Sequence, residues 1–320
     1  GFVYKTDNGG QDWTLKNSGL TSIGGSVTTI TIDPLDHNTI YVGTDRLSLP
    51  GGGGIYRSTN GAESWEPLLN GLPSGAAISV MAATVIEDSG EDTVTLFAAC
   101  KYPPQIYTLT VGTEEWTLYG ETGAVASEIV FIDGSLYVST LGDGLLVDSA
   151  GDGNFQPVNQ GLTDLVINDF HISIDILGER FTVVGTKSDG IFISPNVGTV
   201  GFVDSEGFRF NPVENVAVNP VSPNEIFVST ANRLWVTLDG GITWNPQINL
   251  ILDGSNDLKV TSIAINEASP ELAAITCNQT ESKVEGGFYL RVGPDEWELI
   301  KEGISSTDAP KMRITVSDIV

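Results

Sequence analysis

The chain has 320 residues, of which 41 are acidic and 15 are basic, and its formal net charge is −26. Such an acidic surface would repel a nucleic-acid backbone or an anionic membrane, so neither class of partner is expected. No stretch approaches the roughly 18 consecutive apolar residues of a membrane helix, so direct membrane insertion is not expected either. With 37 Gly and 15 Pro beside many Val, Ile and Thr residues, the composition favours short strands joined by tight turns.

A repeat of short strands recurs along the chain. Its fullest form is an apolar strand, a turn with Pro or Asp, a second strand ending in Gly-Thr or Ser-Thr, a third strand, a polar hairpin and an aromatic residue. One copy runs from Val27 to Thr44 and continues from Gly54 to Trp65, and another runs from Val216 to Trp244. Weaker copies contain the segments SEIVFIDGSLYVSTLGDGLLV, HISIDILGERFTVVGTKSDGIFIS and VTSIAINEASPELAAITC.

The aromatic residue that closes each copy indicates how many repeats there are. These residues are expected at seven positions, Trp13, Trp65, Trp116, Phe155, Phe210, Trp244 and Trp297. Their mean spacing of about 47 residues suits four strands of about five or six residues with their turns. The repeat therefore predicts an all-β fold, a seven-bladed β-propeller of four-stranded antiparallel blades, formed as one domain over residues 1–320.

The two ends of the chain supply different parts of a blade. Residues 1–16 contain only the outer two strands, whereas residues 311–320 resemble an innermost strand. We expect the ring to close by joining the N- and C-terminal strands in one shared blade, which would protect sheet edges from aggregation. Because one strand of that blade is missing, we expect the native polypeptide to continue beyond Val320 and to be part of a larger assembly.

Three of the polar hairpins share a motif, S/T-x-D/N-x-G-x-x-W. It reads TDNGGQDW and TLDGGITW in two copies, while STNGAESW has Ala62 at the usual Gly. The motif residues are Thr6, Asn8, Gly10, Trp13, Ser58, Asn60, Trp65, Thr237, Asp239, Gly241 and Trp244. On these residues the chain resembles the Asp-box (BNR-repeat) propellers of the sialidase-like and sortilin-like superfamily. We expect the motif to be structural, because the short side chain accepts backbone N–H bonds across the turn and the aromatic residue anchors it.

The ligand face of such a propeller is expected at the loops between the second and third strands of each blade. The candidate residues there are Asp45, Arg46, Lys101, Tyr102, Asp143, Lys187, Asp189 and Arg233. Mixed charge around an exposed aromatic residue suits a sugar or a peptide. Solvated loop residues would have the same composition, so both interpretations stay open.

Two catalytic hypotheses follow from the resemblance. A sialidase-like site needs three arginines, a Tyr nucleophile activated by Glu, and an Asp acid/base. The chain has seven arginines in all, and only Arg313 lies on a predicted innermost strand, which disfavours this activity. The alternative is a glycoside hydrolase of the Asp-box type that uses paired carboxylates, since acidic residues are plentiful. The similar xyloglucan-hydrolysing enzymes place their site between two propellers, whereas one is predicted here.

Metal and cofactor motifs are missing from the sequence. His37 and His171 have no second ligand at a suitable spacing, so no transition-metal site and no cofactor are expected, although calcium held by loop carboxylates remains an option. Cys100 and Cys277 each end an apolar strand-like run and are expected to be buried free thiols.

The expected function is that of a non-catalytic binding or structural module with a protein or glycan partner. The resemblance implies an extracellular, periplasmic or cell-surface location, because these propellers act as receptor ectodomains and as modules of secreted or surface proteins. Others are photosystem assembly factors, a role for which we would expect a basic patch that this acidic chain lacks.

Overall fold

Antiparallel strands make up all the regular secondary structure that the computed structural model describes. The described residues are 3–8, 12–20, 26–45, 53–88, 90–174, 179–205, 207, 211–231, 233–247, 258–265, 273–279, 287–293 and 296–300. Their strands form one two-stranded sheet and six four-stranded sheets. The prediction of an all-β chain with seven antiparallel sheets is thus confirmed.

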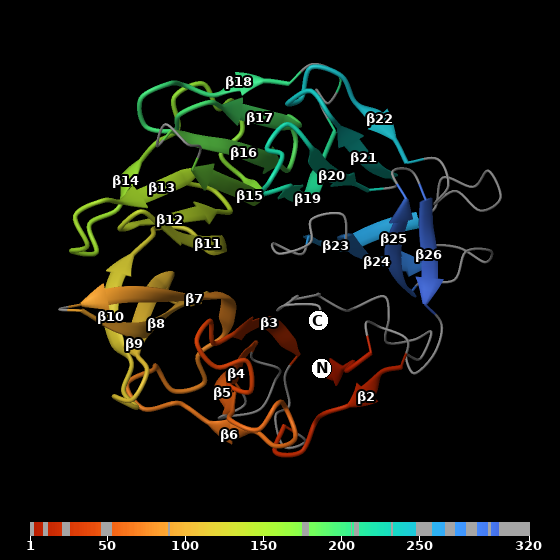
Figure 1. Ribbon diagram of the computed structural model, residues 1–320. Coiled ribbons are helices and arrows are strands. Elements are labelled where there is room, and N and C mark those ends of the chain that lie inside the picture. The colour runs from red at the N-terminus through yellow and green to blue at the C-terminus, as the bar shows by residue number, and fades with distance from the viewer. Residues whose placement is uncertain are drawn as a thin grey trace. The chain divides into compact units, whose positions relative to one another are not determined.

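The contacts divide the chain into two units. Unit 1 comprises Gly1–Lys5 and Thr14–Pro157, and unit 2 comprises Thr6–Trp13 and Val158–Val320. Within each four-stranded sheet the strands follow one another in chain order, from the first strand to the fourth (Figure 1). The strand expected within residues 311–320, and with it the predicted closure of the ring, lies outside the described residues.

Unit 1 contains the two-stranded sheet and three four-stranded sheets. The two-stranded sheet pairs β1 (Tyr4–Lys5) with β2 (Thr14–Leu15). The first four-stranded sheet contains β3 (Val27–Ile32), β4 (Ile40–Thr44), β5 (Gly54–Ser58) and β6 (Glu66–Pro67). The second contains β7 (Ile78–Asp88), β8 (Glu91–Cys100), β9 (Gln105–Thr110) and β10 (Thr117–Glu121). The third contains β11 (Ala126–Ile132), β12 (Ser135–Thr140), β13 (Leu145–Asp148) and β14 (Gln156–Pro157).

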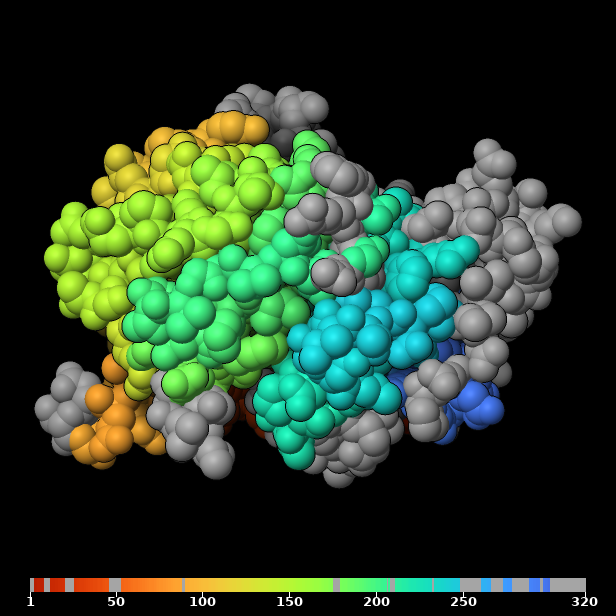
Figure 2. Space-filling model, turned by 90° about the horizontal axis from the view of Figure 1, so that it is seen from above, coloured from red at the N-terminus to blue at the C-terminus, as the bar shows by residue number. Residues whose placement is uncertain are grey.

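Unit 2 contains the other three four-stranded sheets. The first has β15 (Ile167–Ile174), β16 (Arg180–Thr186), β17 (Ile191–Ser194) and β18 (Val203–Asp204). The second has β19 (Val213–Val218), β20 (Ile226–Thr230), β21 (Arg233–Thr237) and β22 (Asn245–Pro246). The third has β23 (Leu258–Ile265), β24 (Ala273–Gln279), β25 (Gly287–Gly293) and β26 (Glu296–Ile300). Figure 2 shows the first two of these sheets as neighbouring green and cyan surfaces.

The second strand of each sheet carries the core. Every residue of β4, β12 and β20 is buried, because each strand is paired on both edges and covered on both faces. This explains why their sequences, IYVGT, SLYVST and IFVST, are nearly continuous apolar runs and do not alternate with polar residues. In contrast, the short outer strands β2, β6 and β14 are exposed.

A β-bulge recurs at the same place in all six four-stranded sheets. The register between the first and second strands shifts after the first paired residue in five sheets, as at Val27/Thr29, Ile78/Val80 and Val213/Asn215. In the sheet β23–β26 two further pairs precede the shift, which lies between Val260 and Ser262. A bulge locally increases the twist of a strand. The sequence repeat contains this feature, but apolar patterning alone does not reveal it.

Consecutive sheets of unit 1 are joined by a backbone hydrogen bond whose acceptor residue is followed by a glycine. The N–H of Trp65 donates to the carbonyl of Ser18, and the N–H of Trp116 donates to the carbonyl of Asn70, both at 2.9 Å. The next residue, Gly19 or Gly71, has a positive φ, and a Cβ there would lie about 2 Å from the tryptophan carbonyl oxygen. The indole Nε1 of Trp116 also donates to the carbonyl of Leu68 at 3.0 Å. Trp65 and Trp116 therefore fasten their sheets to the segment that ends the preceding sheet.

The sheet β15–β18 corrects one sequence expectation. Phe202 is buried, immediately precedes the fourth strand β18, and donates its N–H to the carbonyl of Gln160 at 2.7 Å. It thus takes the position of Trp65 and Trp116, whereas the expected Phe210 lies outside the described residues. The hairpin before β18 shares no motif with its tryptophan-bearing counterparts, so the sequence alone did not single out Phe202.

Both cysteines are buried free thiols, as predicted. Burial raises the pKa of Cys100 to about 11 and also raises that of Cys277, so both thiols stay protonated and unreactive near neutral pH.

Asp148 closes strand β13 and organises the turn that follows. Its carboxylate accepts the N–H groups of Ala150, Gly151 and Gly153 at 2.8–3.0 Å and the hydroxyl of Tyr119 at 2.6 Å. Burial alone would raise the pKa of Asp148, but these hydrogen bonds outweigh it and leave the pKa below its usual value.

We expect Asp148→Asn to lower the free energy of unfolding by about 1–3 kcal/mol at pH 7. The amide NH2 group cannot accept hydrogen bonds, so some of the N–H and O–H donors around the side chain would lose their acceptor. A depressed folded-state pKa stabilises the fold above the unfolded-state pKa, and this stabilisation is lost as pH falls through the folded value. Urea unfolding of both proteins at pH 7 and near pH 3 should show a smaller difference at the lower pH. An equal difference at both pH values would mean that the ionised carboxylate is not responsible.

Candidate functional site

The turns after the second strands share one architecture. A threonine hydroxyl at the end of the strand donates to the carbonyl of the residue at or just before the start of the third strand: Thr44 to Gly54, Thr140 to Gly144, Thr186 to Gly190 and Thr230 to Arg233. The residue after the threonine donates its N–H to the segment before the first strand, as Asp45 does to Ser26 at 3.0 Å. Leu141 and Lys187 make the equivalent bonds to Val125 and Val166, and Lys101, which follows Cys100 in place of a threonine, bonds to Ala77. The backbone is therefore held rigidly where these side chains project.

In unit 1, three of the predicted ligand-face residues lie together. The Lys101 ammonium is 3.8 Å from the Asp45 carboxylate, and both side chains are about 30% exposed. Next to this pair, Tyr102 is 76% exposed, which is unusual for so large an aromatic side chain. Arg46, which was predicted to join them, lies outside the described residues.

A continuous series of contacts extends from this cluster to Asp143. The N–H of Thr122 donates to the carbonyl of Pro104 at 3.3 Å. Its neighbour Gly123 lies against Asp143, because a Cβ on Gly123 would be 2.5 Å from the Asp143 carboxylate. The turns of two consecutive sheets are thus in contact, and Leu141 beside Asp143 is 45% exposed. Thr122 and Gly123 were not predicted, since neither carries a charge or belongs to a motif.

In unit 2, the predicted residues have different surroundings. Asp189 accepts the hydroxyl of Thr163 at 2.7 Å, so it ties its turn to the preceding connection. Lys187 is exposed, and the guanidinium of Arg233 lies 5.8 Å from the ring centre of Trp235. Asp164, which was not predicted, accepts the N–H groups of Val166 and Ser188 and supports the same turn.

The motif hairpins share one hydrogen-bond pattern. In the clearest copy, Asp239 accepts the hydroxyl of Thr237 at 2.7 Å and the N–H of Thr243 at 2.8 Å. The hydroxyl and N–H of Thr243, then the hydroxyl of Thr237, lower the pKa of Asp239 to about 2, so the carboxylate stays ionised. Asn60 accepts the hydroxyl of Ser58 and the N–H of Ser64 in the same way.

The other motif residues have supporting contacts. Asn8 accepts the hydroxyl of Thr6 and the N–H of Asp12, both at 2.9 Å. The N–H of Gly241 donates to the Thr237 hydroxyl, the Trp244 indole donates to Ser205, and Trp13 packs edge-on against Phe288. Gly10 lies outside the described residues. All these contacts hold hairpins in place and none is directed at an open site.

Metal binding has no support among the residues that the structure describes. No three His, Cys, Asp or Glu side chains within this part of the chain are placed so that they could hold a metal ion. Calcium binding therefore stays a prediction from the abundance of loop carboxylates. The described residues also include no helix long and apolar enough to cross a membrane.

Comparison with known proteins shows the fold. No protein-family model and no curated protein matches the sequence. Among solved structures, YCF48 bound to a D1 peptide has a TM-score of 0.62 at 15% identity, over 87% of this chain and 84% of that one. The GH74 xyloglucanase from Xanthomonas campestris has a TM-score of 0.68 at 16% identity, over 94% of this chain but only 51% of the enzyme. The extracellular domain of BT4673 from B. thetaiotaomicron has a TM-score of 0.61 at 12% identity, over 88% of this chain and 34% of that one. These proteins are β-propellers, and the chain has the β-propeller fold.

Proposed function

We propose that the chain is a non-catalytic binding module that acts outside the cytoplasm and binds a protein through the turns after its second strands. The observation that carries this proposal is the presentation of Tyr102. This aromatic side chain is 76% exposed, yet its turn is fixed by the bonds of Lys101 to Ala77 and of Thr122 to Pro104.

A rigid, exposed tyrosine suits a binding anchor for an energetic reason. Tyr is enriched among the few residues that dominate binding energies, and it loses little side-chain entropy on binding. The neighbouring Lys101–Asp45 pair and the exposed Leu141 supply a polar and an apolar contact beside it. The similar structure of YCF48 bound to a D1 peptide supports the binding role. The similar extracellular domain of BT4673 supports a location outside the cytoplasm.

A glycan remains the second class of partner, and glycoside hydrolysis remains the catalytic alternative. The similarity to the GH74 xyloglucanase favours testing xyloglucan first, although the chain spans about half of that enzyme. A retaining or inverting glycosidase needs two carboxylates about 5–10 Å apart on an accessible surface. In the Tyr102 cluster, Asp45 faces Lys101 and Asp143 lies against Gly123.

The binding proposal can be tested with a photo-crosslinking amino acid at position 102. The matched control carries it at Leu118 in the same unit, which is 53% exposed on the fourth strand β10. Incubation with extracellular material from the native source should give one dominant protein adduct from position 102 and none from position 118. The purified partner should then bind Tyr102→Ala at least about tenfold more weakly than the wild type.

Two results would contradict the proposal. One is identical adducts from both positions, together with unchanged affinity of Tyr102→Ala for every adduct protein. The other is release of reducing ends from xyloglucan by the purified chain, which would establish the catalytic alternative.

A further inference from the structure

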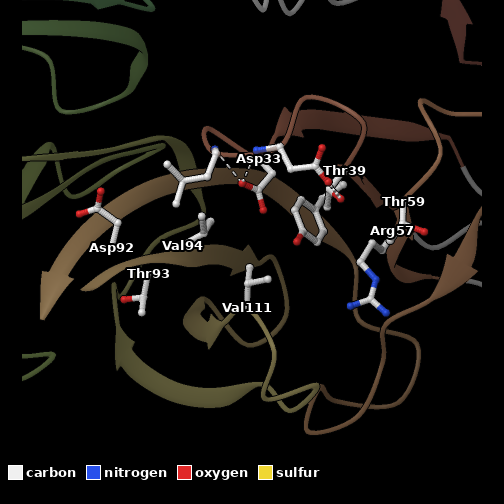
Figure 3. A pocket seen from close by; sticks show the side chains of 11 residues that line it. Asp33, Thr39, Arg57, Thr59, Asp92, Thr93, Val94 and Val111 are labelled. Atoms are coloured by element: carbon white, nitrogen blue, oxygen red, sulfur yellow. Dashed lines mark hydrogen bonds between the residues drawn. The ribbon is translucent and has the colours of Figure 1, made fainter. Parts of the chain in front are cut away.

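A cleft lies between the sheets β3–β6 and β7–β10 of unit 1, at the ends of the strands opposite to the Tyr102 turn. Its volume is about 360 Å³, within the usual range of small-ligand sites. The polar residues that line it are Asp33, Asp36, Thr39, Tyr41, Arg57, Thr59, Asp92 and Thr93, and Leu35, Val94 and Val111 add apolar surface. Figure 3 shows the Asp33 side chain between Arg57 on one side and Asp92 and Thr93 on the other. We refer to this site as the Tyr41 cleft.

The hydroxyl of Tyr41 is an unsatisfied polar group in this cleft. The Tyr41 side chain is completely buried, and its hydroxyl has no hydrogen-bond partner. Burial, and then the charge of Asp33, raise the pKa of Tyr41 to about 12, so the hydroxyl stays protonated. A buried polar group without a partner costs free energy, so a ligand that supplies the partner is favoured.

The hydroxyl is not needed for the fold. By strand register, Phe97 in β8 and Phe227 in β20 occupy the position of Tyr41 in β4, and both are buried phenylalanines. The ring alone therefore meets the packing requirement of this position. A tyrosine also occupies this position in β12, as Tyr137, so the feature that distinguishes Tyr41 is its unsatisfied hydroxyl in an open cleft.

Asp33 supplies an acceptor beside this hydroxyl. Its Oδ1 atom accepts the N–H groups of Leu35 and Asp36 at 2.9 and 3.2 Å and thereby shapes the turn between β3 and β4. Its Oδ2 atom accepts no hydrogen bond from the described residues, although Asp33 is only 4% exposed. Asn219 occupies the equivalent turn in unit 2 and accepts the N–H groups of Val221 and Ser222 in the same way, so the turn itself does not need the charge.

The charge of the cleft favours a cation. Three carboxylates, Asp33, Asp36 and Asp92, line it against one cation, Arg57, which is itself paired with Glu114. The hydroxyl of Thr39 lowers the pKa of Asp36, which therefore stays ionised. These carboxylates are not placed to chelate a metal ion, so a larger organic cation is the better match.

The corresponding position in unit 2 indicates which kind of cation suits the cleft. At the corresponding place, Glu225 precedes β20 as Thr39 precedes β4, and it accepts a hydrogen bond from the Arg291 guanidinium at 3.0 Å. This guanidinium lies 5.1 Å from the ring centre of Phe227, the residue equivalent to Tyr41. Arg291 comes from the third strand of the next sheet, where the register of unit 1 places the apolar Leu109. Unit 2 thus fills this position with its own guanidinium, and unit 1 has no arginine there.

We propose that the Tyr41 cleft binds a guanidinium group from outside the chain, with Asp33 Oδ2 and the Tyr41 hydroxyl as its acceptors. Guanidinium forms strong, charge-assisted hydrogen bonds to carboxylates, and Leu35, Val94 and Val111 would contact its aliphatic stem. The group comes from an arginine side chain of a protein or from a small guanidinium compound. This site goes beyond the proposed function, which uses the opposite ends of the same strands.

The test is a calorimetric or NMR titration of the whole chain with N-acetyl-Gly-Arg-Gly-amide. The control ligand carries citrulline, which has nearly the same shape as arginine but no charge. We expect a dissociation constant of about 1 mM or tighter for the arginine peptide and at least about tenfold weaker binding for the citrulline peptide. Agmatine distinguishes the two sources: equal affinity indicates a small-molecule site, and tighter binding of the peptide indicates a protein partner.

Three variants connect binding to the cleft. Asp33→Asn should weaken binding about tenfold or more, and Tyr41→Phe about threefold, while both melt near the wild-type temperature, as the equivalent Asn219 and Phe227 suggest. Thr39→Glu copies Glu225 and should strengthen binding, which a merely structural residue would not do. The proposal is overturned if the citrulline peptide binds as well as the arginine peptide, or if folded Asp33→Asn binds like the wild type. It is also overturned if no binding is detected at an arginine-peptide concentration tenfold above about 1 mM.

Discussion

Replacing Gly71 by alanine is expected to lower the free energy of unfolding by about 2–5 kcal/mol. Gly71 has φ +86°, and a Cβ there would lie 1.9 Å from the carbonyl oxygen of Trp116 in the next sheet. Backbone atoms cannot yield as a flexible side chain can, so the two sheets would have to move apart. That movement would also break the 2.9 Å hydrogen bond between the Trp116 N–H and the Asn70 carbonyl.

Gly90 provides a matched control. Its φ is +84°, almost that of Gly71, but a Cβ there would meet nothing within 4 Å. Gly90→Ala should therefore show only the left-handed backbone strain, about 1–2 kcal/mol. Urea unfolding of the two variants under the same conditions separates the contributions, and an equal loss in both would show that the close approach between the sheets is unimportant.

Truncation of Trp116 to alanine is expected to lower the free energy of unfolding by about 3–5 kcal/mol. Trp116 is only 2% exposed, lies in the core cluster with Tyr41, Leu68 and Ile78, and donates its indole N–H to the Leu68 carbonyl. Removing it leaves a large cavity at the junction of two sheets and an unsatisfied carbonyl. The cavity and the unsatisfied carbonyl both lower the free energy of unfolding.

Trp116→Phe separates packing from hydrogen bonding. Phe202 fills the equivalent position in the sheet β15–β18, so a phenyl ring is compatible with this junction. We expect a loss of about 1–3 kcal/mol for this variant, mainly from the carbonyl left without its donor. Chemical unfolding followed by circular dichroism measures both variants, and a Trp116→Ala loss below about 1 kcal/mol would show that this residue does not join the sheets.

These two junction residues explain why so diverse a repeat keeps one fold. Neighbouring sheets are held by a backbone bond, a glycine that allows it, and an aromatic ring over it, whereas the hairpin motif is complete in few copies. Loop residues such as Tyr102 and Lys187 are free of these requirements, because bonds of other residues shape their turns. These are backbone bonds for Tyr102, and backbone bonds with the Thr186 hydroxyl for Lys187. Their side chains can therefore serve binding without weakening the fold.

Local patterns in the sequence determined the strands, the antiparallel sheets and the number of sheets. The run IYVGT is apolar because a central strand is covered on both faces, and its terminal Thr44 makes a hydrogen bond that spans only its own turn. The buried thiols Cys100 and Cys277 follow from the same kind of run. Such features depend on neighbours close in the chain, so one sequence is enough to predict them.

Only the tertiary structure revealed the Tyr41 cleft and the place of Phe202. In the sequence, Asp33 reads as a turn residue and Tyr41 as one more apolar residue of a strand. Their significance comes from the neighbouring sheet, where residues 92–94 and 111 close the cleft and leave the Tyr41 hydroxyl without a partner. The equivalence of Leu109 with Arg291 likewise depends on strand register. Contacts between residues 50 or more positions apart leave no periodic signal in the sequence. The residues on the two sides of a junction belong to different repeats, and no regular spacing connects them.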